Sequence, residues 1–302
     1  MTRLQGMSRR GKILLGVVLV YLLGLILFGV AFGVKGAKND TYKPQEEFHL
    51  LTWAHLFGPI NLNKGVLYLV LAGVLTVGIM LFVSKRMQMR PNRVQTAVEW
   101  IYSLSMGMSR DHMDPRMAKK WFPIVATLFT FILVSNLIGY IPLPVNSGAS
   151  FHLFGAKIPS FQIFAATTNV AFPLTLALIV FFAYNIEGVR TQGGRGYLKS
   201  LVPQGLGGKM VLFIFPIEVM SNFLRLVSLT IRLWANLLAG HLLIGFMAGD
   251  LAVLLGLQIV GWFTLPLAIV LFLFEAILIA GLQAFIFAIL SAIYLGGAVS
   301  RH

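Results

Sequence analysis

The chain has 302 residues, of which 58% are hydrophobic and only 11% are charged, and its mean hydropathy is +0.84. A soluble globular domain carries roughly 25% charged residues, so this chain lacks the charge that a water-facing surface needs. Several apolar runs reach the length of about 20 residues that spans a bilayer core. The composition therefore predicts an all-α polytopic integral membrane protein, organised as a single membrane domain over residues 1–302.

The net charge is +14, from 24 Lys and Arg against 10 Asp and Glu. Of the 24 basic residues, 17 fall in loops on one side of the predicted membrane and five on the other, which is the positive-inside bias. The charge therefore indicates an orientation and not nucleic-acid binding. The sequence has no cysteine, which excludes disulfides, thiolate metal sites and a cysteine nucleophile. Since it also lacks phosphate-loop, haem-attachment and zinc-protease motifs, we expect no cofactor and no metal.

The first two thirds of the chain alternate apolar runs with polar connections. The run 13–34 follows four basic residues and predicts a retained N-terminal helix that begins in the cytoplasm, with a cleaved signal peptide as the alternative. A second span is predicted over 65–84. Over 94–109 apolar residues recur every three or four positions, which is typical of an amphipathic helix on the membrane surface. Further spans are predicted over 121–141 and 163–186, joined by an external loop.

The last third consists of two apolar runs, 210–249 and 251–295, that are too long for ordinary spans. As helices they would measure roughly 60 and 67 Å, about twice the hydrocarbon core of about 30 Å. Either each run breaks into two spans, which Gly240, Gly245 and Pro266 would permit, or two long helices lie strongly tilted in the bilayer. Hydropathy leaves both possibilities open.

The first long run carries an arginine, Arg232, far from either end. An arginine at the centre of a membrane helix costs about 2.5–3.5 kcal/mol, and it stays charged at every physiological pH. At about 100° per residue, one face of this helix is a polar stripe about 27 Å long, made of Glu218, Ser221, Arg225, Ser228, Arg232 and Asn236. His241 falls on the opposite face. Ionisable groups inside a membrane indicate an ion path or a proton relay, and the alternative is a structural network between helices.

The second long run holds two strongly polar side chains, Glu275 and Gln283. Their spacing of eight residues places them about 80° apart on a straight helix, so they need not share one face. Burial disfavours an ionised carboxylate, which makes Glu275 a candidate to take up and release protons. His241 is the natural partner because imidazole titrates near physiological pH, although a membrane histidine can also serve only as a hydrogen bond between helices.

Five segments of the chain resemble subunit a of the F-type rotary ATP synthases, bacterial type: Arg232–His241, Leu282–Phe287, Ser135–Pro142, Ala166–Asn169 and Val94–Glu99. The resemblance extends over roughly residues 60–297, and the arginine segment is its most specific part. It implies that the last two helices are long and tilted around a ring of c subunits. It also implies a stator channel subunit with no catalytic site of its own, in contact with the c-ring, the b subunits, membrane lipid and, indirectly, the F1 sector, and not with nucleic acid.

The resemblance also implies roles for individual residues. Arg232 matches the arginine that faces the c-ring carboxylate and separates two aqueous half-channels. Polar positions that line the half-channels are matched by Asn236, Ser228, Glu218, His241, Glu275 and Gln283, and a commonly basic position is matched by Arg225. One departure concerns the acid, because the family places it seven residues before the glutamine and here the separation is eight.

The sequence therefore predicts a proton-conducting stator subunit that couples proton-motive force to rotation of the c-ring and to ATP synthesis. The alternatives are a sodium-coupled version of the same subunit and, in another class, a secondary transporter or a polytopic membrane enzyme. Transporters often contain repeated halves, whereas the Arg232 segment occurs once in this chain. The basic N-terminus favours the plasma (inner) membrane of a bacterium and a cytoplasmic C-terminus.

Overall fold

The computed structural model describes residues 54–57, 60–153, 156–200, 208–251 and 258–299, together with residues 20, 23 and 254. Of the predicted N-terminal helix 13–34, only residues 20 and 23 are among the described residues, so this prediction lies outside the described part of the chain. Among the described residues, five helices are long and apolar enough to cross a membrane. The chain is therefore an all-α polytopic membrane protein, as its composition predicts.

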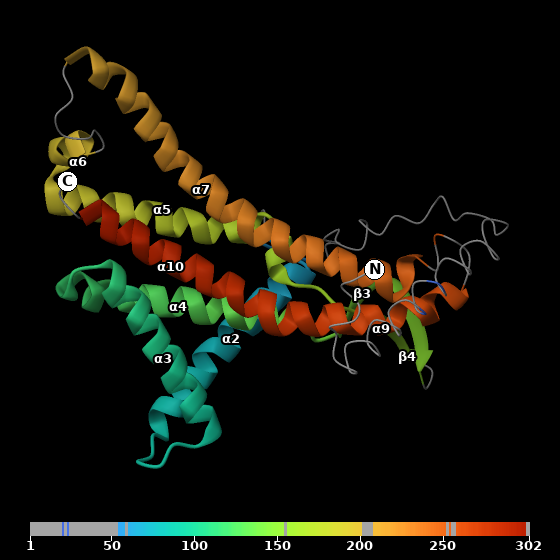
Figure 1. Cartoon of the computed structure of the whole chain (residues 1–302). Helices are drawn as coiled ribbons and strands as arrows, with labels where there is room; N and C mark the ends of the chain where they lie inside the picture. The colour runs from blue at the N-terminus through green and yellow to red at the C-terminus, as the bar shows by residue number, and fades with distance from the viewer. Residues whose placement is uncertain are drawn as a thin grey trace, which may run out of the picture. The chain divides into compact units, whose positions relative to one another are not determined.

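The chain divides into two compact units, residues 1–47 with 242–272 and residues 48–241 with 273–302. The larger unit contains the helices α2 (Lys64–Lys85), α3 (Arg93–His112), α4 (Pro115–Gly139), α5 (Ala171–Gln192), α6 (Gly194–Ser200), most of α7 (Gly208–Gly245) and α10 (Ala280–Val299). Within it α10 lies along both α4 and α5, while α2 and α3 pack against α4 (Figure 1). The prediction of a single membrane domain stays a prediction.

Local sequence accounts for where several of these helices begin and end. The side chain of Asn63 accepts a hydrogen bond from the backbone N–H of Val66 (3.0 Å) and caps α2. Pro115 is the first residue of α4, where its missing N–H costs no helical hydrogen bond. Gly193, with φ of 75°, ends α5 in a conformation that residues with a Cβ rarely adopt.

Two antiparallel hairpins lie in connections that the sequence predicts as loops outside the membrane. One pairs β1 (Ala54–Phe57) with β2 (Ile60–Leu62), and the other pairs β3 (Leu143–Leu153) with β4 (Ala156–Gln162). The second hairpin follows α4 and leads to the short 3₁₀ turn η2 (Ala166–Thr168), which precedes α5. All five candidate spans are helices, so these strands do not alter the fold class.

The last two predicted runs form long helices that do not break at glycine or proline. α7 has 38 residues and passes through Pro216 and Gly240, and it continues into a π-helical segment, η3 (Phe246–Asp250). The smaller unit contains the end of α7, η3 and most of α9 (Gln258–Phe274), which includes Pro266. A π-helical turn, η4 (Glu275–Ile279), then joins α9 directly to α10. A 38-residue helix is about 57 Å long, and the described part of the second run, residues 258–299, is also continuous helix. The strong tilt of both helices in the bilayer stays a prediction.

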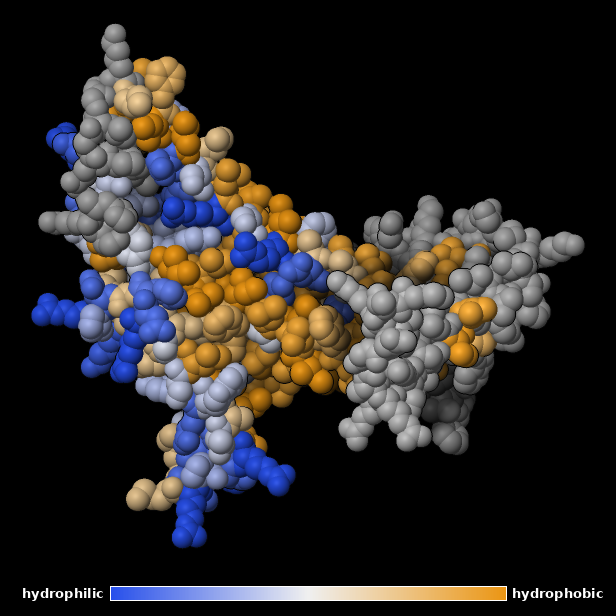
Figure 2. Space-filling model, in the orientation of Figure 1, coloured by the Kyte–Doolittle hydropathy of each residue, from blue (hydrophilic) through white to orange (hydrophobic). Residues whose placement is uncertain are grey.

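The helix α3 packs against α4 and α10. Met108 of the predicted apolar stripe is in the core and Ile101 and Leu104 pack against it, while the polar residues Ser105 and Ser109 are also buried. The two serine hydroxyls donate to backbone carbonyls one turn earlier, at 2.8 and 3.0 Å. Hydrophilic side chains gather over the connections α2–α3, α3–α4 and α5–α6, while hydrophobic ones cover most of the middle of the helices, with one hydrophilic cluster among them (Figure 2). The location of α3 at a membrane surface stays a prediction.

A column of alanines on α10 forms the centre of the larger unit. Ala280, Ala284, Ala288 and Ala292 recur every fourth residue and are each 0% exposed. Small side chains on one helical face allow close approach of neighbouring helices in membranes, and α10 makes its main contacts with α4 and α5. Leu233 and Leu237 of α7 are buried in the same core. The alanine column therefore brings α10 close enough to its neighbours for polar groups on it to be enclosed.

A large side chain in this column should prevent close packing. We expect Ala288→Leu to lower the free energy of unfolding by about 1–3 kcal/mol, the usual cost of overpacking, and to reduce the amount of subunit in membranes. Gly281→Leu is the matched control, because nothing lies within 4 Å of a Cβ built at this α10 position. Thermal stability of the purified complex measures the difference, and equal stability of the two variants would contradict the close packing.

Candidate functional site

The helix α7 has one buried and one exposed face along the predicted polar stripe. Leu226, Leu229, Leu233 and Leu237 are between 8% and 0% exposed and pack into the core. The exposed face carries four residues of the stripe, Arg225, Ser228, Arg232 and Asn236, while Glu218 and Ser221 are half-buried.

Large apolar residues on α7 flank the exposed stripe. Met220, Phe223, Val227 and Ile231 are 58%, 57%, 43% and 49% exposed. Arg232 is thus exposed on an otherwise apolar surface of a membrane helix. A charge in that position needs water or an oppositely charged partner, so this face is suited to contact another membrane component that supplies one.

A second polar group lies buried, where α7 meets the turn η4. The Nδ1 atom of His241 is 3.4 Å from Oε1 of Glu275, and the two residues are 5% and 3% exposed. The same nitrogen lies 3.0 Å from the carbonyl oxygen of Leu237, one turn earlier in α7. Within the described residues, His241 Nε2 and Glu275 Oε1 have no hydrogen-bond partner. The pair thus brings together two groups that can each carry a proton and that retain hydrogen-bonding capacity.

The backbone of α7 approaches the carboxylate of Glu275 closely at Gly240. A Cβ at position 240 would collide with both carboxylate oxygens and with the carboxyl carbon of Glu275. Glycine is therefore the residue that allows a carboxylate to sit against the helix directly beside His241. The sequence contains this glycine, but nothing in its pattern indicates which side chain occupies the space beside it.

The π-helical turn η4 changes the angular relation between Glu275 and Gln283. In this turn the N–H of Ala280 bonds to the carbonyl of Glu275, five residues earlier. A π-turn accommodates one residue more than an α-turn. The eight-residue separation of Glu275 and Gln283 therefore corresponds to the rotation of seven residues in a regular α-helix. That rotation is within about 20° of two full turns, so the two side chains point in nearly the same direction. Both side chains are buried, at 3% and 4% exposed. The spacing of eight residues, one more than the resemblance implies, is therefore compensated by the π-turn that begins at Glu275.

The turn η2 connects three of the helices that surround the His241–Glu275 pair. The Thr167 hydroxyl donates to Oδ1 of Asn136 on α4 (3.1 Å), and Asn136 Nδ2 donates to the carbonyl of Ala280 at the start of α10 (3.3 Å). Trp234 Nε1 of α7 donates to the carbonyl of Thr168 (2.9 Å). Two segments that carry the family resemblance, 135–142 and 166–169, thus fasten α4, α7 and α10 to one another.

Arg225 lies apart from the buried pair, beside a cluster of tyrosines. Its guanidinium is 5.4 Å from the ring centre of Tyr294, within the range of a cation–π contact. It also interacts electrostatically with Tyr184 and Tyr197. Burial raises the pKa of Tyr197, so its hydroxyl remains protonated at physiological pH and donates to the side chain of Asn185 (2.8 Å). Arg225 of α7 thus interacts with tyrosines of α5, α6 and α10, which suits a residue that holds these helices together.

The tyrosine cluster is joined by asparagines that the sequence does not single out. Tyr184 donates to Oδ1 of Asn222 (2.7 Å), and Asn222 Nδ2 donates to Oδ1 of Asn185 (3.1 Å). Near the same end of α5, the buried carboxylate of Glu187 pairs with Lys120 of α4. Sequence reasoning missed both features because the partners are tens of residues apart in the chain.

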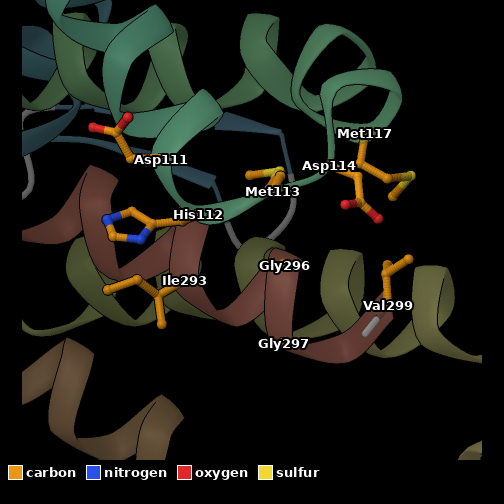
Figure 3. A pocket seen from close by; sticks show the side chains of 9 residues that line it. All are labelled: Asp111, His112, Met113, Asp114, Met117, Ile293, Gly296, Gly297 and Val299. Carbon is orange, nitrogen blue, oxygen red and sulfur yellow. The ribbon is translucent and has the colours of Figure 1, made fainter. Parts of the chain in front are cut away.

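A pocket lies between the α3–α4 connection and the last turns of α10 (Figure 3). Its volume is about 460 Å³, and it is lined by Asp111, His112, Met113, Asp114, Met117, Ile293, Gly296, Gly297 and Val299. It contains none of the predicted site residues. Among the described residues, no three His, Cys, Asp or Glu side chains lie close enough to hold a metal ion.

A bundle of membrane-spanning helices with an exposed arginine stripe and an enclosed histidine–glutamate pair defines an ion-transporting membrane protein. Residues 66–296 match the family of the ATP synthase A chain. The chain is 35% identical to ATP synthase subunit a of Helicobacter acinonychis (strain Sheeba) over 253 residues, which are 84% of this chain and 97% of the relative.

Two further relatives give the same result. ATP synthase subunit a of Helicobacter pylori (strain P12) is 35% identical over the same shares of each chain, 84% and 97%. That of Rhodopseudomonas palustris (strain BisA53) is 35% identical over 77% of this chain and 86% of the relative. The chain belongs to the ATP synthase subunit a family. It is accordingly a multi-pass membrane protein that serves ion transport and ATP synthesis.

The position of the acid on η4 should matter more than its distance along the sequence. Exchanging Glu275 and its neighbour (Glu275→Ala with Ala276→Glu) rotates the carboxylate by about 100°, away from His241, and we expect ATP-driven ion transport to be lost. Deletion of Ile277 should instead turn the π-turn into an α-turn, keep the flanking registers and retain transport. Both are measured in membrane vesicles that contain the complete complex.

Deletion of Ile289, in the regular part of α10, is the control. It removes one residue where no π-turn exists and turns the rest of the helix by about 100°, so we expect no assembled complex. If deletion of Ile277 is as damaging as deletion of Ile289, the π-turn does more than absorb an inserted residue.

Proposed function

We propose that this chain is the stator channel subunit of an Fo sector, and that it conducts protons through two half-channels to and from a carboxylate on a rotating c-ring. Proton-motive force is thereby coupled to rotation and to ATP synthesis. The observation that carries the proposal is Arg232, which is exposed on α7 outside the face of its buried leucines and has exposed apolar side chains beside it. Membership of the ATP synthase subunit a family supports the same role.

The physics of a membrane carboxylate explains why an arginine is needed on that face. A carboxylate on the ring can face lipid only when it is protonated, because an ionised acid in hydrocarbon is very costly. A fixed guanidinium attracts the ionised form and so favours release of the proton beside Arg232. It also repels protons that would otherwise pass directly between the half-channels. Lysine would serve less well because it loses its proton readily when it is buried.

The energy available sets what the subunit must prevent. One elementary charge that crosses 100 mV releases about 2.3 kcal/mol, and this energy is lost if the proton leaks without turning the ring.

In our proposal Asn236, Ser228, Glu218, Gln283, His241 and Glu275 line the half-channels. Arg225 fits a positioning role, since its neighbours are the tyrosines of α5, α6 and α10.

The buried pair favours protons over sodium as the coupling ion. His241 and Glu275 lie 3.4 Å apart, and imidazole relays protons near neutral pH, whereas a Na⁺ site is built from oxygen ligands. We propose the c-ring and the b subunits as direct partners and the F1 sector, which holds the catalytic sites, as an indirect one. The corresponding location is the plasma (inner) membrane of a bacterium, with a cytoplasmic C-terminus.

The first test replaces the exposed arginine in the complete complex. In inverted membrane vesicles, we expect Arg232→Ala to abolish ATP-driven acidification while the assembled ring remains present, because the c-ring carboxylate loses its counter-charge. Passive proton leak is followed in the same vesicles, and an increase indicates that Arg232 also separates the half-channels. Arg190→Ala is the matched control, since Arg190 is exposed beyond the apolar part of α5, and its acidification should be normal.

Normal pumping by Arg232→Ala would contradict the proposed function and would favour the alternative of a secondary transporter.

The coupling ion is tested with the native complex in the same assay. Acidification that is the same with and without added Na⁺ supports proton coupling, whereas pumping that requires Na⁺ identifies the sodium-coupled form.

The second test concerns the buried histidine. We expect His241→Ala to slow proton transport several-fold and to change its dependence on pH, because Glu275 loses the titratable group 3.4 Å away. Transport rates measured from pH 6 to 9 in reconstituted vesicles report both effects. A slower rate with the pH profile unchanged would mean that His241 acts only in packing.

A further inference from the structure

We propose that Tyr140 is a positioning residue for proton transfer, and that its hydroxyl holds the Glu275 carboxylate in place beside His241. This inference rests on the proposed function. Tyr140 lies in one of the segments that carry the family resemblance, yet its residue type and its place in the chain predict no role. The structure brings it to the buried pair from a third helix.

The first support for this role is the location of Tyr140 at the end of α4. It is the residue that terminates the helix, and its backbone N–H bonds to the carbonyl of Leu137 (3.2 Å). The residue is 5% exposed. Its backbone is therefore fixed by the helix end, and its side chain is directed into the protein.

The second support is contact with both members of the pair. The ring centre of Tyr140 is 4.9 Å from that of His241, and the two ring planes are tilted by 37°. Its hydroxyl is near enough to the carboxylate of Glu275 for the two groups to interact electrostatically, and Oε1 of that carboxylate has no hydrogen-bond partner within the described residues. The ionisable groups that face one another here are thus Tyr140 from the end of α4, His241 from α7 and Glu275 from η4.

The third support is that, among the residues that the structure describes, the other contacts of the Glu275 carboxylate include no strong hydrogen-bond donor. His241 Nδ1 is closer to the carbonyl of Leu237 (3.0 Å) than to Glu275 (3.4 Å). The backbone at Gly240 limits where the carboxylate can move but provides only van der Waals contact. A phenol hydroxyl donates one hydrogen bond, and hydrogen bonds to charged acceptors are stronger than those between neutral groups.

A tyrosine suits a positioning role because it does not itself exchange protons in the working range. Its phenol ordinarily titrates near pH 10, so the hydroxyl remains a donor while Glu275 changes its charge. The donor stabilises the ionised carboxylate and orients it, and the ring limits the positions that the imidazole can adopt. Tyr140 would thereby set the pH at which the pair exchanges a proton.

The test is Tyr140→Phe in the complete complex, which keeps the ring and removes only the hydroxyl. We expect the pH profile of proton transport to move upward by about one pH unit, which is a tenfold change in proton affinity. The infrared band of the protonated carboxyl, identified by its absence in Glu275→Gln, should shift its midpoint by the same amount. Tyr197→Phe is the control, because it removes a buried hydroxyl that donates to Asn185 on the other side of the unit.

The outcomes are distinct from those that test the proposed function. If native vesicles pump and Arg232→Ala does not, but both midpoints are unmoved in Tyr140→Phe, only the role of Tyr140 is overturned. A complex that does not assemble with Tyr140→Phe would make the hydroxyl structural and would overturn it as well. If Arg232→Ala pumps normally while the infrared midpoint still moves, the proposed function fails and the Tyr140–Glu275 contact stands.

Discussion

The arrangement of this protein depends on the close approach of α7 to a carboxylate on the neighbouring helix. At Gly240 the backbone leaves no space for a Cβ, because the carboxylate of Glu275 occupies it. An ionisable group enclosed in a membrane protein is costly unless other groups compensate its charge. Here His241 and Tyr140 come from two other helices to the same carboxylate. The remaining contacts of the larger unit serve to keep those three helices in register.

Two kinds of contact maintain that register, one apolar and one polar. The alanine column of α10 allows α4 and α5 to approach closely, so the gain comes from van der Waals packing, which is what membrane helices rely on. Asn136, Thr167 and Trp234 then fix the relative positions of α4, α7 and α10 with directional hydrogen bonds. Apolar packing alone tolerates sliding of one helix along another, whereas each of these bonds is satisfied at only one position.

The same helix separates the buried pair from the exposed arginine. Because α7 turns by about 100° per residue, His241 and Arg232 lie on opposite faces, one enclosed and one exposed. The arginine is thus available to a partner in the membrane, and the pair remains protected from lipid. A single continuous helix suits this division of roles, since a break between the two residues would uncouple their orientations.

The amino-acid sequence was enough to predict the class of protein, the helices α2 to α5 to within eight residues at either end, the stripe on α7, and the acid and histidine of the pair. These follow from composition and from helical periodicity, which are local properties. The folded structure was needed to establish that residues 208–251 and 258–299 each form a continuous helical segment, that η4 absorbs the extra residue before Gln283, and that Tyr140 and Gly240 adjoin the His241–Glu275 pair. A π-turn leaves no periodic signal in an almost wholly apolar run, and contacts between residues from 34 to 135 positions apart depend on packing that no local pattern encodes.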